Sequence, residues 1–391
     1  ANARLLSDGF LSALNLDLSV LPDQGAKVRL PTGNVETLIS ALQMQVSYDA
    51  ERQGGWTASL IANDFSRLGN EFSQASIVAS GIVANATDAA QRSIEFATKG
   101  VVGGIRLSDA DAGRALGDSI EFLGDGSWRA NSALKFDGFQ LNADAIQLAT
   151  TGVLSGLNYE GTTDLEIQRL AAFSGLADRR LTGQAKLRVQ GSTDLVFGGF
   201  ELLLDGTASQ ISIGDPIADK LLDTQIGLSG TVSRNEEGLG FKKFHMGNTR
   251  FQTAIDGRYA TGISDLRAVG EIFELAALSD QAAGPLQVTV SATGTNETHK
   301  VNTEIAMQRG SLRDRPVAGL SASFDGTIDP DWLRGQLSGS GQLGTDPFSL
   351  AGNLAVKLQS ADARTAFTIE KMRAVIGASR LLADLSSDGT Q

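Results

Sequence analysis

The stretch from Gly339 to Gly344 matches the G-x-G-x-x-G pattern, in which glycine amides approach the pyrophosphate of a dinucleotide. That chemistry needs a strand before the glycines and a helix after them. Here Asp346-Pro347 follows at once and a further alternating segment comes next, so a flexible glycine-rich turn is the favoured interpretation. No cofactor is predicted.

The two histidines, His245 and His299, have no carboxylate or second histidine close to them in sequence. Asp109-Ala110-Asp111 is similar to the start of a calcium loop, but the third acidic ligand is missing. With no cysteine, a thiolate nucleophile or a zinc ribbon is excluded. Neither a catalytic nor a metal site is predicted, and we expect the chain not to be an enzyme. An enzyme remains the third hypothesis, which a carboxylate cluster in a cleft would revive.

Composition narrows the possible partners. The net charge is −12 and the pI is about 4.7, whereas proteins that grip nucleic-acid phosphates carry clustered Lys and Arg. No nucleic acid is therefore expected. The longest inspected uncharged stretch, Phe72 to Thr87, is too short and too polar to span a membrane. The chain starts at Ala1, without an initiator Met, which predicts a piece of a longer protein.

Apolar residues recur at every second position, for instance from Ala13 to Val20, which places them on one face of a strand. Such rows can solvate hydrocarbon on one side of a sheet while the alternate residues, such as Asn15, Asp17, Ser19 and Gln45, face water. The candidate residues for an apolar groove are Leu14, Leu16, Leu18, Val20, Leu42, Met44, Val46, Leu187, Val189, Leu202, Leu204, Ile211, Ile213, Ile226, Leu228, Leu286, Val288, Val290, Leu354, Val356 and Leu358.

Glycines separate many of these runs. There are 45 glycines but only 7 prolines, which favours turns between paired strands over a disordered tether. Turns are predicted at Gly54-Gly55, Asp125-Gly126, Asp205-Gly206, Asp256-Gly257 and Asp325-Gly326.

Short helical inserts are expected between some strands. The clearest runs from Asp215 to Leu222, where Asp215 can cap the helix and Pro216 can occupy its first turn. The segments from Asp109 to Leu116 and from Glu166 to Ala177 are weaker candidates of the same kind.

The chain also repeats itself at a spacing of about 105 residues, where 139–174 aligns with 244–279 without a gap. A repeat this long and this rich in strands predicts one continuous array in which each unit packs against its neighbours. The predicted units are 1–120, 121–230 and 231–391. Identical positions include Phe139 and Phe244, Gln147 and Gln252, Gly152 and Gly257, Glu166 and Glu271, and Leu170 and Leu275.

Three phrases, from Leu228 to Phe241, from Phe251 to Gly257 and from Gly270 to Leu278, resemble the TamB family of the AsmA-like group. The resemblance implies a protein of the Gram-negative periplasm that is anchored in the inner membrane and meets an outer-membrane barrel, TamA, through a C-terminal domain. It also implies carriage of phospholipid along a hydrophobic groove and support of outer-membrane protein assembly. The chain would be a middle section without anchor or terminal domain, and the family offers no catalytic residues to transfer.

The fold expected from these observations is all-β. We expect an elongated, repetitive antiparallel sheet, curled into an apolar trough that accepts phospholipid acyl chains, with a few short helical inserts. The alternative is a structural or adhesive β-repeat protein whose sheet faces are both closed and which transports no lipid.

Overall fold

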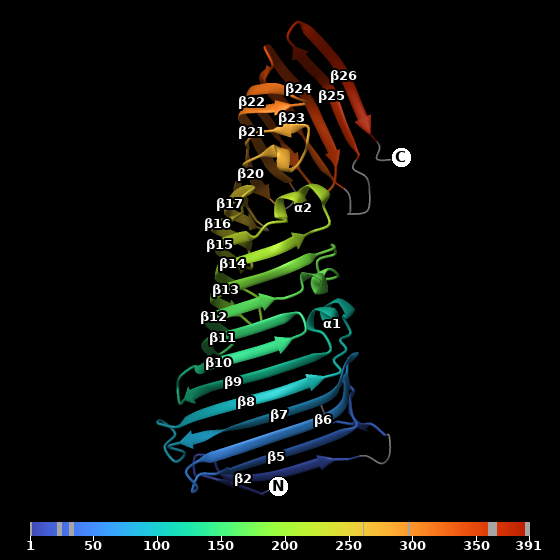
Figure 1. The fold of residues 1–391 in the computed structure, drawn as a ribbon. Coiled ribbons are helices and arrows are strands. Elements are labelled where there is room, and N and C mark those ends of the chain that lie inside the picture. The colour runs from blue at the N-terminus through green and yellow to red at the C-terminus, as the bar shows by residue number, and fades with distance from the viewer. Residues whose placement is uncertain are drawn as a thin grey trace. The chain divides into compact units, whose positions relative to one another are not determined.

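The computed structural model describes residues 2–21, 26–30, 35–260, 262–295, 298–358 and 366–387. Contacts divide the chain into two compact units. Unit 1 comprises Ala1–Phe197 with Gln210–Gly214, and unit 2 comprises Gly198–Ser209 with Asp215–Gln391. Both are built almost wholly of antiparallel strands joined to their neighbours in sequence, which confirms the all-β, antiparallel expectation (Figure 1). The three-unit division stays a prediction.

In unit 1 each strand pairs mainly with the next one along the chain, and β8 to β12 lie side by side in chain order (Figure 1). Its strands are β1 (Asn2–Leu5), β2 (Leu11–Val20), β3 (Val28–Arg29), β4 (Thr37–Ile39), β5 (Ala41–Asp49), β6 (Gly55–Arg67), β7 (Asn70–Ala84), β8 (Ser93–Gly103), β9 (Ser119–Arg129), β10 (Leu134–Ala143), β11 (Ile146–Ser155), β12 (Asn158–Ile167) and β13 (Thr182–Asp194).

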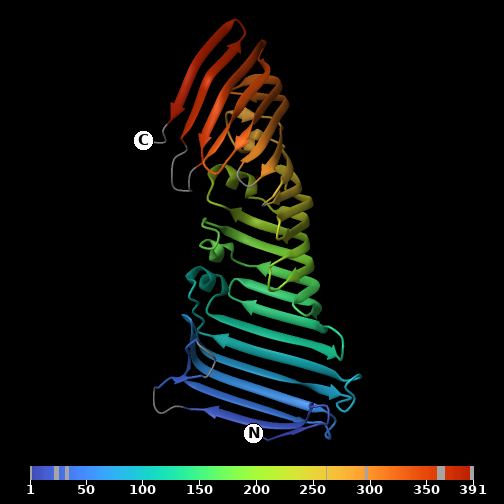
Figure 2. The same ribbon diagram turned by 180° about the vertical axis from the view of Figure 1, so that it is seen from behind.

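Unit 2 follows the same plan, and its last strands succeed one another in chain order, drawn in red in Figure 2. Its strands are β14 (Phe200–Ser212), which extends into the 210–214 segment of unit 1, β15 (Ile226–Asn235), β16 (Gly238–Gly247), β17 (Phe251–Ala260), β18 (Ser264–Ile272), β19 (Ala282–Ala283), β20 (Leu286–Thr295), β21 (Thr298–Leu312), β22 (Arg315–Ile328), β23 (Trp332–Leu343), β24 (Asp346–Lys357), β25 (Phe367–Ile376) and β26 (Ser379–Ser387).

The same order of elements occurs once in each unit. In unit 1, helix α1 (Ala110–Leu116) precedes β9 to β12 and the 3-10 helix η1 (Leu170–Phe173) follows them. In unit 2, helix α2 (Pro216–Leu222) precedes β15 to β18 and the 3-10 helix η2 (Leu275–Ala277) follows them. Strands β11 and β17 begin and end 105 residues apart, which is the spacing found in the sequence.

All four predicted Asp-Gly turns are wrong. Asp125-Gly126, Asp205-Gly206, Asp256-Gly257 and Asp325-Gly326 all lie inside strands, and only Gly54-Gly55 stands at a turn. The G-x-G-x-x-G segment is likewise mostly strand, because β23 runs to Leu343 and only Gly344 falls in the turn after it.

Aromatic rings explain why glycine occupies strand interiors. The rings of Phe96 and Phe136, on the strands either side of β9, lie 6.4 Å apart near Gly126. A Cβ added to Gly126 would lie 2.9 Å from Cζ of Phe96 and 2.3 Å from the backbone oxygen of Lys135. The missing side chain therefore makes room for the ring of a neighbouring strand.

Bulges interrupt the alternation of several strands and are held by aspartates. In β16 the backbone of Lys243 adopts φ 49°, and its N–H donates to Oδ1 of Asp256 at 2.8 Å. In β25 Lys371 adopts φ 53° and donates to Oδ1 of Asp384 at 2.7 Å. The extra residue shifts the register, so that apolar residues three apart fall on one face.

The helices begin where the capping residues predict. Oδ1 of Asp215 accepts from the N–H groups of Ile217 and Ala218, and Asp109 caps α1 in the same way. The third expected helix is wrong over most of its length. Glu166 and Ile167 belong to β12, and only the short η1 follows.

The carboxylate of Glu274 caps the start of η2, where its Oε1 accepts from the N–H of Ala276 at 3.2 Å. The same oxygen accepts from the N–H of Gly284 at 2.6 Å. These two bonds, that from Gly284 first, hold the pKa of Glu274 below its usual range. A lowered folded-state pKa stabilises the fold above the unfolded-state pKa, and that contribution is lost as the pH falls through the folded-state value.

Glu274→Gln is therefore expected to lower stability at neutral pH and to make stability fall less steeply as the pH is lowered. Urea midpoints measured from about pH 7 to about pH 3 should fall less steeply for the variant than for the wild type. Parallel profiles would contradict this role of the carboxylate.

Candidate functional site

The apolar rows of unit 1 share one face of its sheet. Register pairs Leu16 with Val46, Val46 with Ala58, and Ala58 with Ala79, so these side chains point to the same side. We call this side the apolar face of unit 1. The predicted groove residues on it are Leu14, Leu16, Leu18, Val20, Leu42, Met44, Val46, Leu187 and Val189.

Unit 2 has an apolar face of its own. Register pairs Leu228 with Met246, Gly270 with Val288, and Val288 with Ile305. The predicted groove residues on the apolar face of unit 2 are Leu202, Leu204, Ile226, Leu228, Leu286, Val288, Val290, Leu354 and Val356.

Three predicted residues stand outside these rows. Ile211 and Ile213 follow Gln210, whose φ of 55° interrupts the alternation of β14, and both are half-buried. Leu358 follows the end of β24, where its N–H donates to the backbone oxygen of Asp331.

Several members of the apolar faces were missed from the sequence. The row that starts at Leu18 and Met44 continues through Leu60, Ile77, Phe122, Leu141, Leu148 and Leu165 before it reaches Leu187. Most of their strands mix Ala, Gly and Thr with the large residues, so the alternation is weak in any single strand. The ring of Phe122 fills the space over Gly100 on the neighbouring strand, a relation that appears only once the strands are paired.

The apolar faces are incompletely covered. Among the described residues, buried apolar side chains form a small cluster of Ile39, Ala62 and Ala75, whereas the groove residues are mostly half-buried. The chain exposes 23801 Å² of surface, and two separate globular domains of half its mass would together expose about 18,000 Å². The excess indicates sheets that are open on a face and not closed around dry cores.

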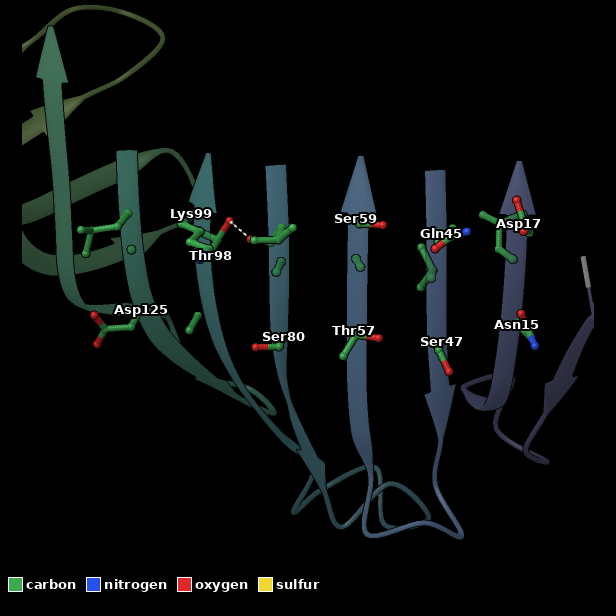
Figure 3. A pocket seen from close by; sticks show the side chains of 18 residues that line it. Asn15, Asp17, Gln45, Ser47, Thr57, Ser59, Ser80, Thr98, Lys99 and Asp125 are labelled. Atoms are coloured by element: carbon green, nitrogen blue, oxygen red, sulfur yellow. Dashed lines mark hydrogen bonds between the residues drawn. The ribbon is translucent and has the colours of Figure 1, made fainter. Parts of the chain in front are cut away.

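The opposite, polar face of unit 1 carries a hollow of about 820 Å³ across six strands (Figure 3). Asn15, Asp17 and Gln45 line it, together with short hydroxyl side chains such as Ser47 and Thr57. The predicted polar residues therefore lie on the face away from the apolar rows. A second hollow, of about 600 Å³, lies over the polar face of unit 2 beside His245 and Glu271.

The other histidine forms a buried pair with a serine. Nε2 of His299 lies 3.1 Å from Oγ of Ser264, which donates to the backbone oxygen of Ala260 and accepts from the Ala260 N–H. Ser264 is 0% exposed, and its hydroxyl joins the last residue of β17 to the first residue of β18. Within the described ranges, no three His, Cys, Asp or Glu residues are grouped to hold a metal ion.

Comparisons with known proteins identify no relative of the chain. No family model, no curated protein and no solved structure gives a significant match to the chain. Among the helices of the described residues, none has the length and apolar character to cross a membrane.

Proposed function

We propose that the apolar faces of units 1 and 2 bind the acyl chains of phospholipid and conduct them between membranes. The observation that carries this proposal is a row of large apolar side chains that register aligns across consecutive strands and that remains only half-buried. Extended apolar surface of this kind, bordered by polar residues, marks sites that bind an apolar partner.

The energy of burial suits this role. A chain of about 15 methylenes gains on the order of 12 kcal/mol when it leaves water, at about 0.8 kcal/mol per CH₂. Sliding along a uniform apolar row exchanges one set of contacts for an equivalent set, so movement need not overcome the whole of that energy. The alternate polar residues keep the opposite face hydrated.

The wider setting proposed is that of a TamB-like bridge in the periplasm of a Gram-negative bacterium, in a full-length protein anchored in the inner membrane. Its partner there would be the outer-membrane barrel TamA, reached through a C-terminal domain, and assembly of outer-membrane proteins would depend on it. The order of the phrases from Leu228 to Leu278 supports this proposal.

Lipid extraction tests the acyl-chain proposal directly. The chain is expressed in bacteria with intact envelopes, purified, and extracted with organic solvent, and the extract is analysed by mass spectrometry. We expect phospholipid in the extract, and less of it from Val46→Asp than from Gln45→Asp, which places the same carboxylate on the polar face of the same strand.

The structural or adhesive alternative predicts a different result. If phospholipid is absent from the wild type and the chain forms stable assemblies with its apolar faces covered, the array is a spacer or an adhesive surface. Equal amounts of lipid in the Val46→Asp and Gln45→Asp extracts would show that the lipid does not bind to the apolar face.

A further inference from the structure

Four neighbouring strands, β5 to β8, each begin or end at one border of the apolar face of unit 1. Tyr48 lies near the end of β5 and Trp56 near the start of β6, where register pairs the two residues directly. Arg92 stands just before β8, two residues ahead of Ile94, which is paired with Val83 and Trp128. We call this border of unit 1 the rim.

The rim is closed by a contact between segments that the sheet order separates. Four strand spacings lie between β2 and β8, or about 19 Å in a flat sheet. Yet Nη2 of Arg92 lies 2.5 Å from Oδ2 of Asp8, and its guanidinium lies 3.8 Å from the ring centre of Phe10. The turn before β2 and the loop before β8 therefore meet across the intervening strands.

Two polar atoms are buried near this contact without partners. Neither Oη of Tyr48 nor Nε1 of Trp56 has a hydrogen-bond partner among the described residues, and neither atom is accessible to solvent. Tyr48 is only 7% exposed. Burial raises the pKa of Tyr48, and the nearby charge of Arg92 opposes that rise. Unpaired donors in such a place are unfavourable unless a ligand uses them.

The two charged residues at the rim, Arg92 and Asp8, differ in how deeply they are buried. Arg92 is 9% exposed and also donates from Nε and Nη2 to the backbone oxygen of Ala86. Asp8, whose side chain is 33% exposed, sits on a short turn at the surface and is the easier of the two to displace. A second anion could take the place of its carboxylate while Arg92 stays where it is.

We propose that Arg92, Tyr48 and Trp56 form a phosphate site for the head group of a phospholipid, which Asp8 occupies as an internal anion when no lipid is bound. This inference rests on the proposed function, because the acyl chains would continue along the apolar face of unit 1. The guanidinium, the hydroxyl and the indole N–H are all donors, and phosphate oxygens can accept from each. Displacement of Asp8 frees the guanidinium of Arg92 for the phosphate.

The proposal gives two substitutions opposite effects. Arg92→Gln removes the charged donor and is expected to weaken binding of an anionic phospholipid about tenfold. Asp8→Asn removes the competing carboxylate and is expected to strengthen binding about threefold or more. The matched controls are Arg188→Gln and Asp164→Asn, which alter an exposed Arg–Asp pair between β12 and β13 and should change neither value.

Tyr48→Phe provides a variant that preserves the fold. The free protein loses only a hydroxyl that has no partner, so its urea midpoint should not fall. Its affinity for the phospholipid should fall about threefold, because the bound phosphate loses one donor. A lower midpoint with unchanged affinity would overturn the assignment.

The probes are phosphatidylglycerol, diacylglycerol with the same acyl chains, and inorganic phosphate. Each lipid is offered in micelles of nonionic detergent, and retained lipid is measured by mass spectrometry after gel filtration. We expect the wild type to retain phosphatidylglycerol about tenfold better than diacylglycerol. Arg92→Gln should lose this preference while it keeps its binding of diacylglycerol.

The outcomes separate the two proposals. Equal retention of both lipids by the wild type overturns the phosphate site and leaves the proposed function standing, whereas retention of neither lipid overturns the proposed function. Suppose that inorganic phosphate binds as tightly as the lipid and changes the tryptophan fluorescence, and that this change is lost in Trp56→Phe. The lipid source is then overturned and the site belongs to free phosphate.

Discussion

Val288→Asp is expected to reduce the phospholipid retained by unit 2 about tenfold or more while the sheet remains folded. Val288 stands in the middle of the apolar face, between Gly270 on β18 and Ile305 on β21. An acyl chain that crosses this point would have to strip water from the carboxylate without supplying a partner. A penalty of about 1.4 kcal/mol already lowers affinity tenfold, and an uncompensated carboxylate exceeds it.

The fold should survive because the face is open. Without lipid the new carboxylate can stay hydrated, since Val288 is only half-buried. Gln287→Asp is the matched control, because Gln287 is exposed on the other face of the same strand. Val356→Asp on β24 should act as Val288→Asp does. If circular dichroism shows that both apolar-face variants are unfolded while Gln287→Asp is not, the rows belong to a closed core.

Phe324→Ala is expected to lower the free energy of unfolding of unit 2 by about 3 kcal/mol. Phe324 is 8% exposed, and its ring covers two strand glycines: a Cβ on Gly326 or Gly335 would lie 2.6 or 2.8 Å from its Cζ. Removal of the ring opens a cavity that the bare backbone cannot fill. Trp332 reports on this unit in urea denaturation when Trp56 and Trp128, which lie in unit 1, are replaced by Phe in both the reference protein and the variant.

Ser323→Ala is the control for this substitution. Its hydroxyl lies 2.8 Å from that of Ser338 on the exposed face, and its loss should change stability by no more than about 0.5 kcal/mol. A loss of less than about 1 kcal/mol in Phe324→Ala would contradict the view that rings over glycines hold the apolar face together.

The sequence predicted strands well where the alternation was strong and turns poorly where glycine stood next to aspartate. Alternation from Leu14 to Val20 reports directly on the face of a strand, because side chains there have a period of two. Gly126 looked like a turn because its real partners, Phe96 and Phe136, are distant in sequence and approach it only through pairing across strands. The aspartates beside such glycines had the same local appearance whether or not they held a bulge, as Asp256 does.

The candidate site divides in the same way. By itself the sequence determined that the protein is all-β and that large apolar residues line one side of its strands, because both follow from the period of two along each strand. It also determined that elements recur at a spacing of 105 residues, because identical residues recur at that spacing in the chain. Only the tertiary structure decided which rows continue across neighbouring strands and that Asp8 meets Arg92 at the rim, where Tyr48 and Trp56 each have a buried polar atom without a hydrogen-bond partner. These two charges are 84 residues apart in the chain. The register and curvature that join them arise from pairing over many strands, which no local pattern encodes.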